Sequence, residues 1–447
     1  MFTNTTFLTQ TLGCRVNQAE TKKISNQLTS LGYQEAKDNQ PPDIVIINTC
    51  VITQKGEQES IKVIRRFKKT YPNCLLIATG CAVNLWLKIS KKKQPPPADL
   101  FITNEKKSTI PKIIAKRFPF SCQIRDLPIR KPLIDPGSVK RVFVKVQDGC
   151  NHFCSYCIVP YLRTKPTSKR VEQIVKEINQ AYRAGTKEVV LCGINLSLFG
   201  QDLDSPTTFA DLIEEILEKT KIPRLSLSSL TPKLINQKLI NIFIADQEKN
   251  RRLSSYWHLA LQSGSKTVLE RMNRQTNLKQ LNQSLHYIKE ALPYFTLRAD
   301  IMIGFPGETD QEFNQTQEFI KKNRLSFGHL FSYSPRPQTK AQKMIKNKIW
   351  TAVPNQVKKE RRKKLQAIIK KNREREKNFL LGKTREILIL KPGSYGWWGL
   401  SDNYWPTKIR TKENKKKDLI GQIIPVKIVD SEDKFLWGNF VKTDQTS

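Results

Sequence analysis

Three cysteines in one short stretch have the spacing of ligands to a single metal centre. Cys150, Cys154 and Cys157 follow the pattern Cys-x3-Cys-x2-Cys, which lets one loop wrap three thiolates around one metal group. A structural zinc site is closed by four protein ligands, whereas three thiolates on a four-iron, four-sulfur cluster leave one iron free to bind another group. The alternative is a Cys3His zinc site completed by His152 or by a distant residue. Because His152 stands between the first two cysteines and would strain a tetrahedral loop, the spacing favours the cluster.

Three further cysteines each follow a strand-like segment near the N-terminus. Cys14, Cys50 and Cys81 come after predicted strands over residues 5–12, 43–48 and 74–79, and helical patterns separate these strands. Such alternation predicts a parallel α/β sheet, whose strand ends share the edge where open α/β folds place their ligands. The three thiols could therefore converge. The pattern alone supports equally well three ordinary buried cysteines.

The remaining cysteines have no predicted ligand role. Cys74 begins its strand at the opposite edge of the sheet, Cys122 lies in a proline-rich segment, and Cys192 lies inside an apolar strand where packing is expected. The N-terminal ten residues carry neither a basic start nor a long apolar run, and no stretch approaches the ~20 apolar residues of a membrane helix. We therefore expect a cytoplasmic protein whose nine cysteines are reduced, which favours metal ligation or catalysis over disulfides.

The central region alternates strands with helices, as a β/α barrel does. Six strands are predicted over residues 141–147, 187–192, 224–228, 256–262, 295–303 and 326–333. A partial parallel barrel is the simplest arrangement for them. Its functional face should be formed by the C-terminal strand ends, where the loop of three cysteines, Gly193 and Asn195 fall.

At residues 150–157 the sequence resembles the radical S-adenosylmethionine superfamily, and over nearly the whole chain it resembles the methylthiotransferases within that superfamily. The matching stretches are residues 11–20 (TLGCRVNQAE), 48–50, 79–81, 154–161, 258–264, 300–309 and 329–336. So many matches in the same order are hard to obtain by chance. The resemblance implies an enzyme with two [4Fe-4S] clusters, one held by Cys150, Cys154 and Cys157 and a second held by Cys14, Cys50 and Cys81.

The resemblance also implies the chemistry of each cofactor. No ionisable side chain can break an unactivated C–H bond, so a cofactor must carry that step. Reductive cleavage of S-adenosyl-L-methionine at the first cluster would release a 5′-deoxyadenosyl radical, and the second cluster would provide sulfur that receives a methyl group from another S-adenosylmethionine. Tyr156 resembles the aromatic residue that packs on the cofactor's adenine, and Gly193 and Asn195 are candidate contacts for its polar end. No catalytic acid or base is assigned.

The charge of the chain indicates a large anionic partner. Lys and Arg number 77 against 40 Asp and Glu, a net charge of +37, and residues 340–377 alone carry 15 Lys and Arg against three Glu. Many clustered positive charges can neutralise many phosphates, so this region favours a nucleic acid partner over a small substrate.

Beyond residue 382, short β-rich pieces over residues 386–390, 422–429 and 434–440 predict a small barrel that resembles a TRAM domain. In the family this module binds RNA. Aromatic residues beside cations suit splayed bases and phosphates, although Trp398 and Trp437 could equally fill the barrel. We expect this module to be separable from the metal sites.

Together these features predict an α/β protein with three domains. They are an N-terminal parallel α/β methylthiotransferase domain (1–118), a radical SAM core built as a partial six-strand β/α barrel (140–378) and an all-β TRAM barrel (379–441), with a linker over 119–139. The implied partners are tRNA, at its anticodon stem-loop, and an electron donor such as flavodoxin or ferredoxin, with no membrane.

Residues 13–20 most resemble the branch that methylthiolates threonylcarbamoyladenosine at position 37 of tRNA, on the 3′ side of the anticodon. The product would be 2-methylthio-threonylcarbamoyladenosine. The alternatives are methylthiolation of isopentenyladenosine in tRNA, modification of a ribosomal protein side chain, or a non-catalytic iron–sulfur or zinc protein that binds RNA. A substrate base with a carboxylate would suit a pocket containing a cation. The candidate cations are Arg163, Lys165, Arg298 and Arg336.

Overall fold

The computed structural model describes residues 5–37, 40–90, 95–119, 141–411 and 419–441. Cys122 and nearly all of the predicted linker lie outside these residues. The chain divides into two compact units: the first contains residues 1–136, 148–166 and 334–343, and the second contains residues 137–147, 167–333 and 344–447. Within the described ranges, no helix is long and apolar enough to cross a membrane.

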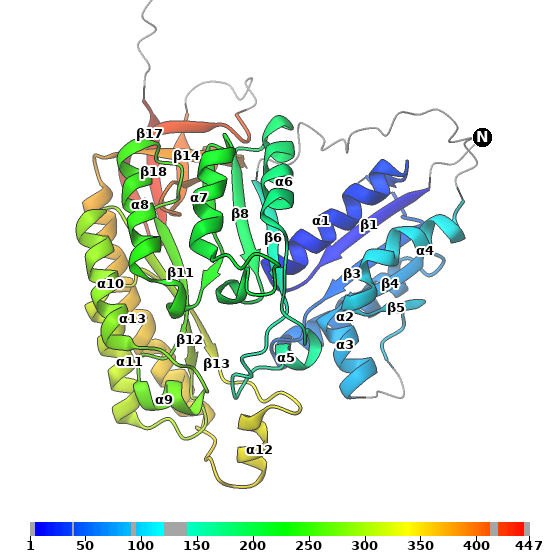
Figure 1. The fold of residues 1–447 in the computed structure, drawn as a ribbon, viewed down its shortest axis with the longest axis horizontal. Helices are drawn as coiled ribbons and strands as arrows, with labels where there is room; N and C mark the ends of the chain where they lie inside the picture. The colour runs from blue at the N-terminus through cyan, green and yellow to red at the C-terminus, as the bar shows by residue number, and fades with distance from the viewer. Residues whose placement is uncertain (1–4, 38–39, 91–94, 120–140, 412–418, 442–447) are drawn as a thin grey trace, which may run out of the picture. The chain divides into compact units, whose positions relative to one another are not determined.

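The first unit is built on a five-stranded parallel sheet (Figure 1). Its spatial order is β2 (Gln34–Glu35), β1 (Thr6–Thr11), β3 (Ile44–Thr49), β4 (Leu75–Gly80) and β5 (Leu100–Ile102), with every neighbouring pair parallel. The predicted parallel α/β arrangement is therefore confirmed. The edge strands β2 and β5 were not predicted, because two or three residues are too few to show a strand period.

Helices cover both faces of this sheet. They are α1 (Arg15–Ser30), α2 (Gln54–Thr70), α3 (Cys81–Asn84), η1 (Leu85–Ile89), η2 (Asn104–Thr109), α4 (Ile110–Arg117) and α5 (Val159–Leu162). Ile44 and Ile46 pack with residues of α1 and α4 on one face. Val45 and Ile47 pack with residues of α2, α3 and α5 on the other. Burial on both faces explains why the central strands are apolar throughout instead of alternating.

The second unit contains all six predicted central strands. They are β6 (Arg141–Asp148), β8 (Glu188–Gly193), β9 (Arg224–Leu227), β11 (Tyr256–Gln262), β12 (Thr296–Ile303) and β13 (Phe327–Ser332). Two short strands, β7 (Thr167–Ser168) and β10 (Ser229–Leu230), complete two four-stranded sheets of order β7-β6-β8-β9 and β10-β11-β12-β13. The pairs among the six long strands are parallel.

Helices line the outer face of these strands (Figure 1). They are α6 (Val171–Arg183), α7 (Phe209–Lys219), α8 (Gln237–Lys249), α10 (Leu278–Ala291), α11 (Asp310–Lys322) and α13 (Asn355–Leu380). The chain also forms α9 (Lys266–Arg271), the short turns η3 (Leu196–Leu198) and η4 (Pro232–Leu234), and a helix α12 (Lys340–Lys346) that spans the boundary between the units. Capping boxes, formed by Thr208 with Asp211 and by Thr309 with Glu312, start α7 and α11. Alternate strand residues such as Leu259 join the helices in one core.

The C-terminal segment forms a closed barrel, as predicted. Its strands are β14 (Thr384–Gly393), β15 (Gly396–Ser401), β16 (Pro406–Arg410), β17 (Ile423–Glu432) and β18 (Phe435–Phe440), closed in the order β14-β15-β16-β18-β17. The sequence analysis missed β15 and β16, which lie in the segment where aromatic residues and cations obscure the alternation. Trp397 and Trp405 fill the barrel core, whereas Trp398 does not belong to it.

This barrel packs closely on the central strands of the second unit, whereas both cysteine sets belong to the first, so its separability from the metal sites stays a prediction. The Tyr404 hydroxyl donates to the buried Glu188 carboxylate at 2.5 Å, and its ring stacks on Tyr256 at a centroid distance of 4.3 Å. The Arg224 guanidinium donates to the carbonyl oxygens of Leu400 and Glu386 at 3.0 and 2.9 Å. Truncation near residue 379 would remove the barrel's contacts from these buried groups of the central strands.

Candidate metal centres

The structure brings Cys14, Cys50 and Cys81 together at the C-terminal edge of the first sheet. Cys14 is the N-cap of α1, Cys50 follows β3 directly, and Cys81 is the first residue of α3. The three thiols are close enough for Cys14 and Cys81 to raise the pKa of Cys50 electrostatically. Strand ends of one parallel sheet thus converge as the fold requires.

Two glycines allow this close approach. Gly13 has φ = 90°, and a Cβ atom there would lie 2.6 Å from the Cys50 sulfur. Gly80, just before Cys81, has φ = 104°, and a Cβ atom there would lie 2.5 Å from the carbonyl oxygen of Thr49. L-residues with a side chain rarely adopt this conformation, and neither position has room for one.

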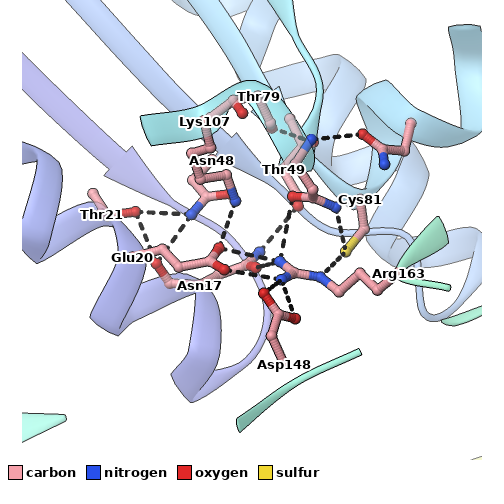
Figure 2. Close-up of polar contacts among 12 residues, drawn as sticks. Asn17, Glu20, Thr21, Asn48, Thr49, Thr79, Cys81, Lys107, Asp148 and Arg163 are labelled. Carbon is pink, nitrogen blue, oxygen red and sulfur yellow. Dashed lines mark hydrogen bonds and ion pairs between the residues drawn. The ribbon is translucent and has the colours of Figure 1, made fainter. Parts of the chain in front are cut away.

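Side-chain amides and a hydroxyl tie the three loops to one another (Figure 2). The Asn17 amide donates to the carbonyl oxygens of Leu12 and Thr49 at 2.8 and 3.0 Å. The Asn48 amide donates to the carbonyl oxygen of Asn17 at 3.0 Å, and the Thr49 hydroxyl donates to that of Thr79 at 2.6 Å. The loops after β1, β3 and β4 are therefore held in fixed relative positions.

A buried arginine lies at the centre of the charges around this site (Figure 2). The side chain of Arg163 is 3% exposed, and its Nη1 donates to Glu20 at 2.9 Å and to Asp148 at 2.7 Å. Its Nε donates to the sulfur of Cys81 at 3.4 Å. Lys107 donates to Glu20 at 2.5 Å. Burial opposes the charge of Arg163, but Cys81, Asp148 and Glu20 outweigh it and hold its pKa well above the usual value.

The donor set fits a thiolate-bound iron–sulfur cluster. Burial raises the pKa of Cys14, and burial together with the neighbouring thiols raises the pKa of Cys50 to about 11. Thiols in this state ligate only when a cationic metal group displaces their protons. Arg163 then provides a positive charge beside Cys81, which would compensate a cluster and its thiolates.

The second cysteine set lies on a loop of the same unit, directly after β6. The Cys150 backbone N–H donates to the carbonyl oxygen of Arg163 at 3.1 Å, and that of Cys157 donates to Cys154 at 2.9 Å. All three thiols are partly exposed, and His152 is exposed. In the part of the chain that the structure describes, no three His, Cys, Asp or Glu side chains are grouped closely enough to hold a single metal ion.

Models of known protein families match the two segments of the chain that carry the two cysteine sets. A model of the uncharacterized protein family UPF0004 matches residues 6–102, and a model of the radical SAM superfamily matches residues 144–320. The threonylcarbamoyladenosine tRNA methylthiotransferase MtaB of Chlamydia pneumoniae is 35% identical over 86% of this chain and 87% of its own length. The tRNA-2-methylthio-N(6)-dimethylallyladenosine synthase of Clostridium tetani is 30% identical over 95% of this chain and 93% of its own length. The chain belongs to the radical SAM methylthiotransferase family.

The predicted fold and cofactors of this methylthiotransferase are confirmed. Its fold is similar to that of the radical S-adenosylmethionine methyltransferase TsrM of Kitasatospora setae, with a TM-score of 0.52 over 77% of this chain and 78% of that chain at 12% identity. The methylthiotransferase uses two [4Fe-4S] clusters and S-adenosylmethionine. It is an enzyme of the predicted class.

The residues predicted to contact S-adenosylmethionine fall in both units. Tyr156 is partly exposed on the cysteine loop. Gly193 ends β8, and a Cβ atom there would lie 2.8 Å from the Leu196 side chain. Asn195 is buried, and its Oδ1 accepts from the Ser197 backbone N–H at 3.2 Å and hydroxyl at 2.8 Å. Asn195 thus shapes the turn after β8, and a contact of these residues with the cofactor stays a prediction.

Two of the four cations considered for a substrate carboxylate form ion pairs with carboxylates of the protein. Arg163 is paired with Glu20 and Asp148, and Arg336, whose side chain is 2% exposed, is paired with Glu57 at 2.8 Å. Both guanidiniums already pair with carboxylates of the protein, and a contact of either with the substrate stays a prediction. Lys165 is exposed on the cysteine loop, and Arg298 lies on β12 in the second unit.

The sequence analysis missed the carboxylates and the lysine that surround Arg163. Asn17, Glu20 and Thr21 are buried on α1, at the three- and four-residue spacing where a helix normally shows apolar residues to the core. Polar residues on a buried helix face are a signal of an internal network. That signal was present, but the partner Lys107 could not be read from it.

Proposed function

We propose that this methylthiotransferase modifies tRNA, converting threonylcarbamoyladenosine at position 37, on the 3′ side of the anticodon, into 2-methylthio-threonylcarbamoyladenosine. The observation that carries the proposal is the presence of both cysteine sets in one compact unit, joined through Arg163. The relatives support the substrate: those from Chlamydia pneumoniae, Aquifex aeolicus and Bacillus subtilis are named threonylcarbamoyladenosine tRNA methylthiotransferases. Methylthiolation of isopentenyladenosine is the second candidate, because other relatives are named dimethylallyladenosine synthases.

In this proposal each cysteine set holds one cluster. Cys150, Cys154 and Cys157 hold the cluster that binds S-adenosylmethionine, and the second cluster is held by Cys14, Cys50 and Cys81. When bound, the two clusters and the cofactor supply radical cleavage of a C–H bond and sulfur for insertion. The chain itself orients the ligands through Arg163. The carbonyl oxygen of Arg163 accepts a hydrogen bond from the Cys150 backbone, and the guanidinium of Arg163 donates a hydrogen bond to the Cys81 sulfur.

Reduction of the first cluster requires a low-potential electron donor, and a flavodoxin or ferredoxin is part of the proposal. A cytoplasmic location is also part of it, because the substrate is tRNA.

The long helix α13 offers a basic surface for tRNA phosphates. Some cations of this helix are used internally, since Arg361 is paired with Glu308 at 2.7 Å and Lys377 with Glu374 at 2.8 Å. The exposed cations of α13 are Lys359, Lys363, Lys364, Lys370, Lys371 and Arg375. Six exposed charges are enough to release several counterions from RNA, so affinity for tRNA should fall steeply with salt.

The C-terminal barrel offers cations stacked on aromatic rings. Lys391 lies over Trp398 at 5.2 Å, and Lys408 lies over Phe435 and Trp437 at 4.6 and 4.7 Å. Their neighbours along the strands, Trp397, Ile409 and Leu436, fill the barrel core, so Lys391, Trp398, Lys408 and Phe435 face away from it, while Trp437 is 8% exposed beneath Lys408. We call Lys391, Trp398, Lys408, Phe435 and Trp437 the cation–aromatic ladder. Rings and cations of this kind stack on bases and neutralise phosphates.

Replacing a ring of the ladder is expected to weaken tRNA binding without affecting the metal centres. Trp398→Ala or Phe435→Ala should each cost about 1–3 kcal/mol for every base that stacks on the ring. Binding is measured at several salt concentrations, and iron content is measured in parallel. The matched control is Tyr287→Ala, which removes an exposed ring from α10. Equal affinities of ladder and control variants, or an affinity indifferent to salt, would contradict this interpretation.

The substrate is tested by mass spectrometry of tRNA nucleosides from a strain that lacks the gene. We expect 2-methylthio-threonylcarbamoyladenosine to disappear while threonylcarbamoyladenosine accumulates and methylthio-isopentenyladenosine is unchanged. Loss of the isopentenyl species instead would favour the second candidate. If both nucleosides persist and a ribosomal protein loses a methylthio group, the tRNA proposal fails.

A further inference from the structure

The inner face of the sheet β10-β11-β12-β13 in the second unit is polar. Leu259 of β11 and Leu297 and Ala299 of β12 point into the core shared with the helices. Because side chains alternate along a strand, the residues between them lie on the opposite face. His258 and Arg298 are direct partners across β11 and β12, and Asp300 is the partner of His329 across β12 and β13.

The carboxylate on this face lies against other protein groups. Asp300 lies 2.9 Å from His258 Nε2 and 3.2 Å from His329 Nδ1, and the Ser229 hydroxyl donates to it at 3.3 Å. Although burial opposes ionisation, the two neighbouring histidines hold the pKa of Asp300 well below its usual value. Asp300 is therefore an anion whose acceptor positions face the histidines and the serine.

Arg298 is left without a counter-ion on the same face. Its Nε is buried and has no hydrogen-bond partner among the residues that the structure describes. Within those residues, no carboxylate forms an ion pair with Arg298, in contrast to Arg163 and Arg336. A guanidinium is always charged, and a buried N–H group such as this one is costly unless it is paired. An anion brought by a ligand would pair it.

We propose that Arg298 binds the carboxylate of the threonylcarbamoyl group of the substrate base, with His258 and His329 beside it on the inner face. This inference rests on the proposed function. The planar guanidinium of arginine matches a carboxylate with two parallel hydrogen bonds, which gives both affinity and orientation. Such a contact would position the adenine by its modified end and would discriminate against a base that lacks the carboxylate.

S-adenosylmethionine is the other source of a carboxylate in this reaction. The experiment must therefore separate the two sources.

The test measures binding of two RNAs to anaerobically reconstituted protein. One is an anticodon stem-loop with threonylcarbamoyladenosine at position 37, and the other is the same RNA with adenosine there. Wild-type protein should prefer the first RNA, and Arg298→Gln should reduce this preference by roughly tenfold to a hundredfold, the effect of losing a charge-assisted pair. Arg298→Lys should retain part of it. Arg183→Gln, on the exposed side of α6, is the matched control and should retain all of it.

The affinity for S-adenosylmethionine is measured on the same variants. It should be unchanged by Arg298→Gln, as should iron content and thermal unfolding, since Arg298 has no ion pair to lose. If Arg298→Gln keeps the preference for the modified RNA, or weakens S-adenosylmethionine binding instead, the assignment of Arg298 is overturned while the proposed function stands. If wild-type protein does not distinguish the two RNAs, the proposed substrate and the role of Arg298 both fail.

Discussion

Replacing Cys150, Cys154 and Cys157 together with alanine should lower the iron content of reconstituted protein from about eight to about four per chain. It should also abolish cleavage of S-adenosylmethionine. The physical reason is that this loop supplies three thiolates to one cluster and leaves its fourth iron open for the cofactor. Iron analysis and detection of 5′-deoxyadenosine under reducing conditions measure the two effects. Zinc in place of iron, or cleavage that survives the triple change, would contradict the assignment.

The matched change at the other cysteine set separates the two roles. Replacing Cys14, Cys50 and Cys81 with alanine should also leave about four irons, but cleavage of S-adenosylmethionine should persist while sulfur insertion stops. The two sets lie in the same unit, so a general loss of folding would remove both activities together. Cys74→Ala is a further control, because Cys74 is a buried cysteine of that unit outside both sets.

Replacing Arg163 with leucine should destabilise the first unit by about 3–5 kcal/mol, the usual cost of removing one partner from a buried ion pair. The change removes a shared partner from Asp148 and Glu20, while Lys107 still pairs with Glu20. Urea unfolding of the apoprotein measures the effect without the contribution of the clusters. Arg163→Lys should cost less, because it keeps one charge but loses the guanidinium geometry.

An exposed arginine of the same unit provides the control. Arg65→Leu on α2 removes an exposed side chain and should change stability by less than about 0.5 kcal/mol. Combining Glu20→Gln with Arg163→Leu should cost less than the sum of the two single changes, since each removes the same interaction. Strict additivity, or an Arg163→Leu protein as stable as the control, would show that the network does not hold the unit together.

Much of the fold could be predicted from the sequence because strands and turns leave patterns in neighbouring residues. Each of the six central strands, and each of the three strands of the first sheet that a cysteine follows, carries consecutive or alternating apolar residues and is bounded by turns, and their order predicts parallel pairing. The edge strands β2 and β5 were not predicted because they are too short to show a pattern. The barrel strands β15 and β16 escaped because outward aromatic residues such as Trp398 hide their alternation.

The sequence by itself determined which thiols could act as ligands, since the spacing of Cys150, Cys154 and Cys157 is a covalent property of one loop. The strand-end positions of Cys14, Cys50 and Cys81 were equally visible. What only the tertiary structure decided is where each charge finds its partner. Arg163 meets Glu20 across 143 positions of the chain, and Arg336 meets Glu57 across 279. Pairing at such separations depends on how the elements pack and not on any local pattern, so the sequence could not distinguish these arginines from the uncompensated Arg298.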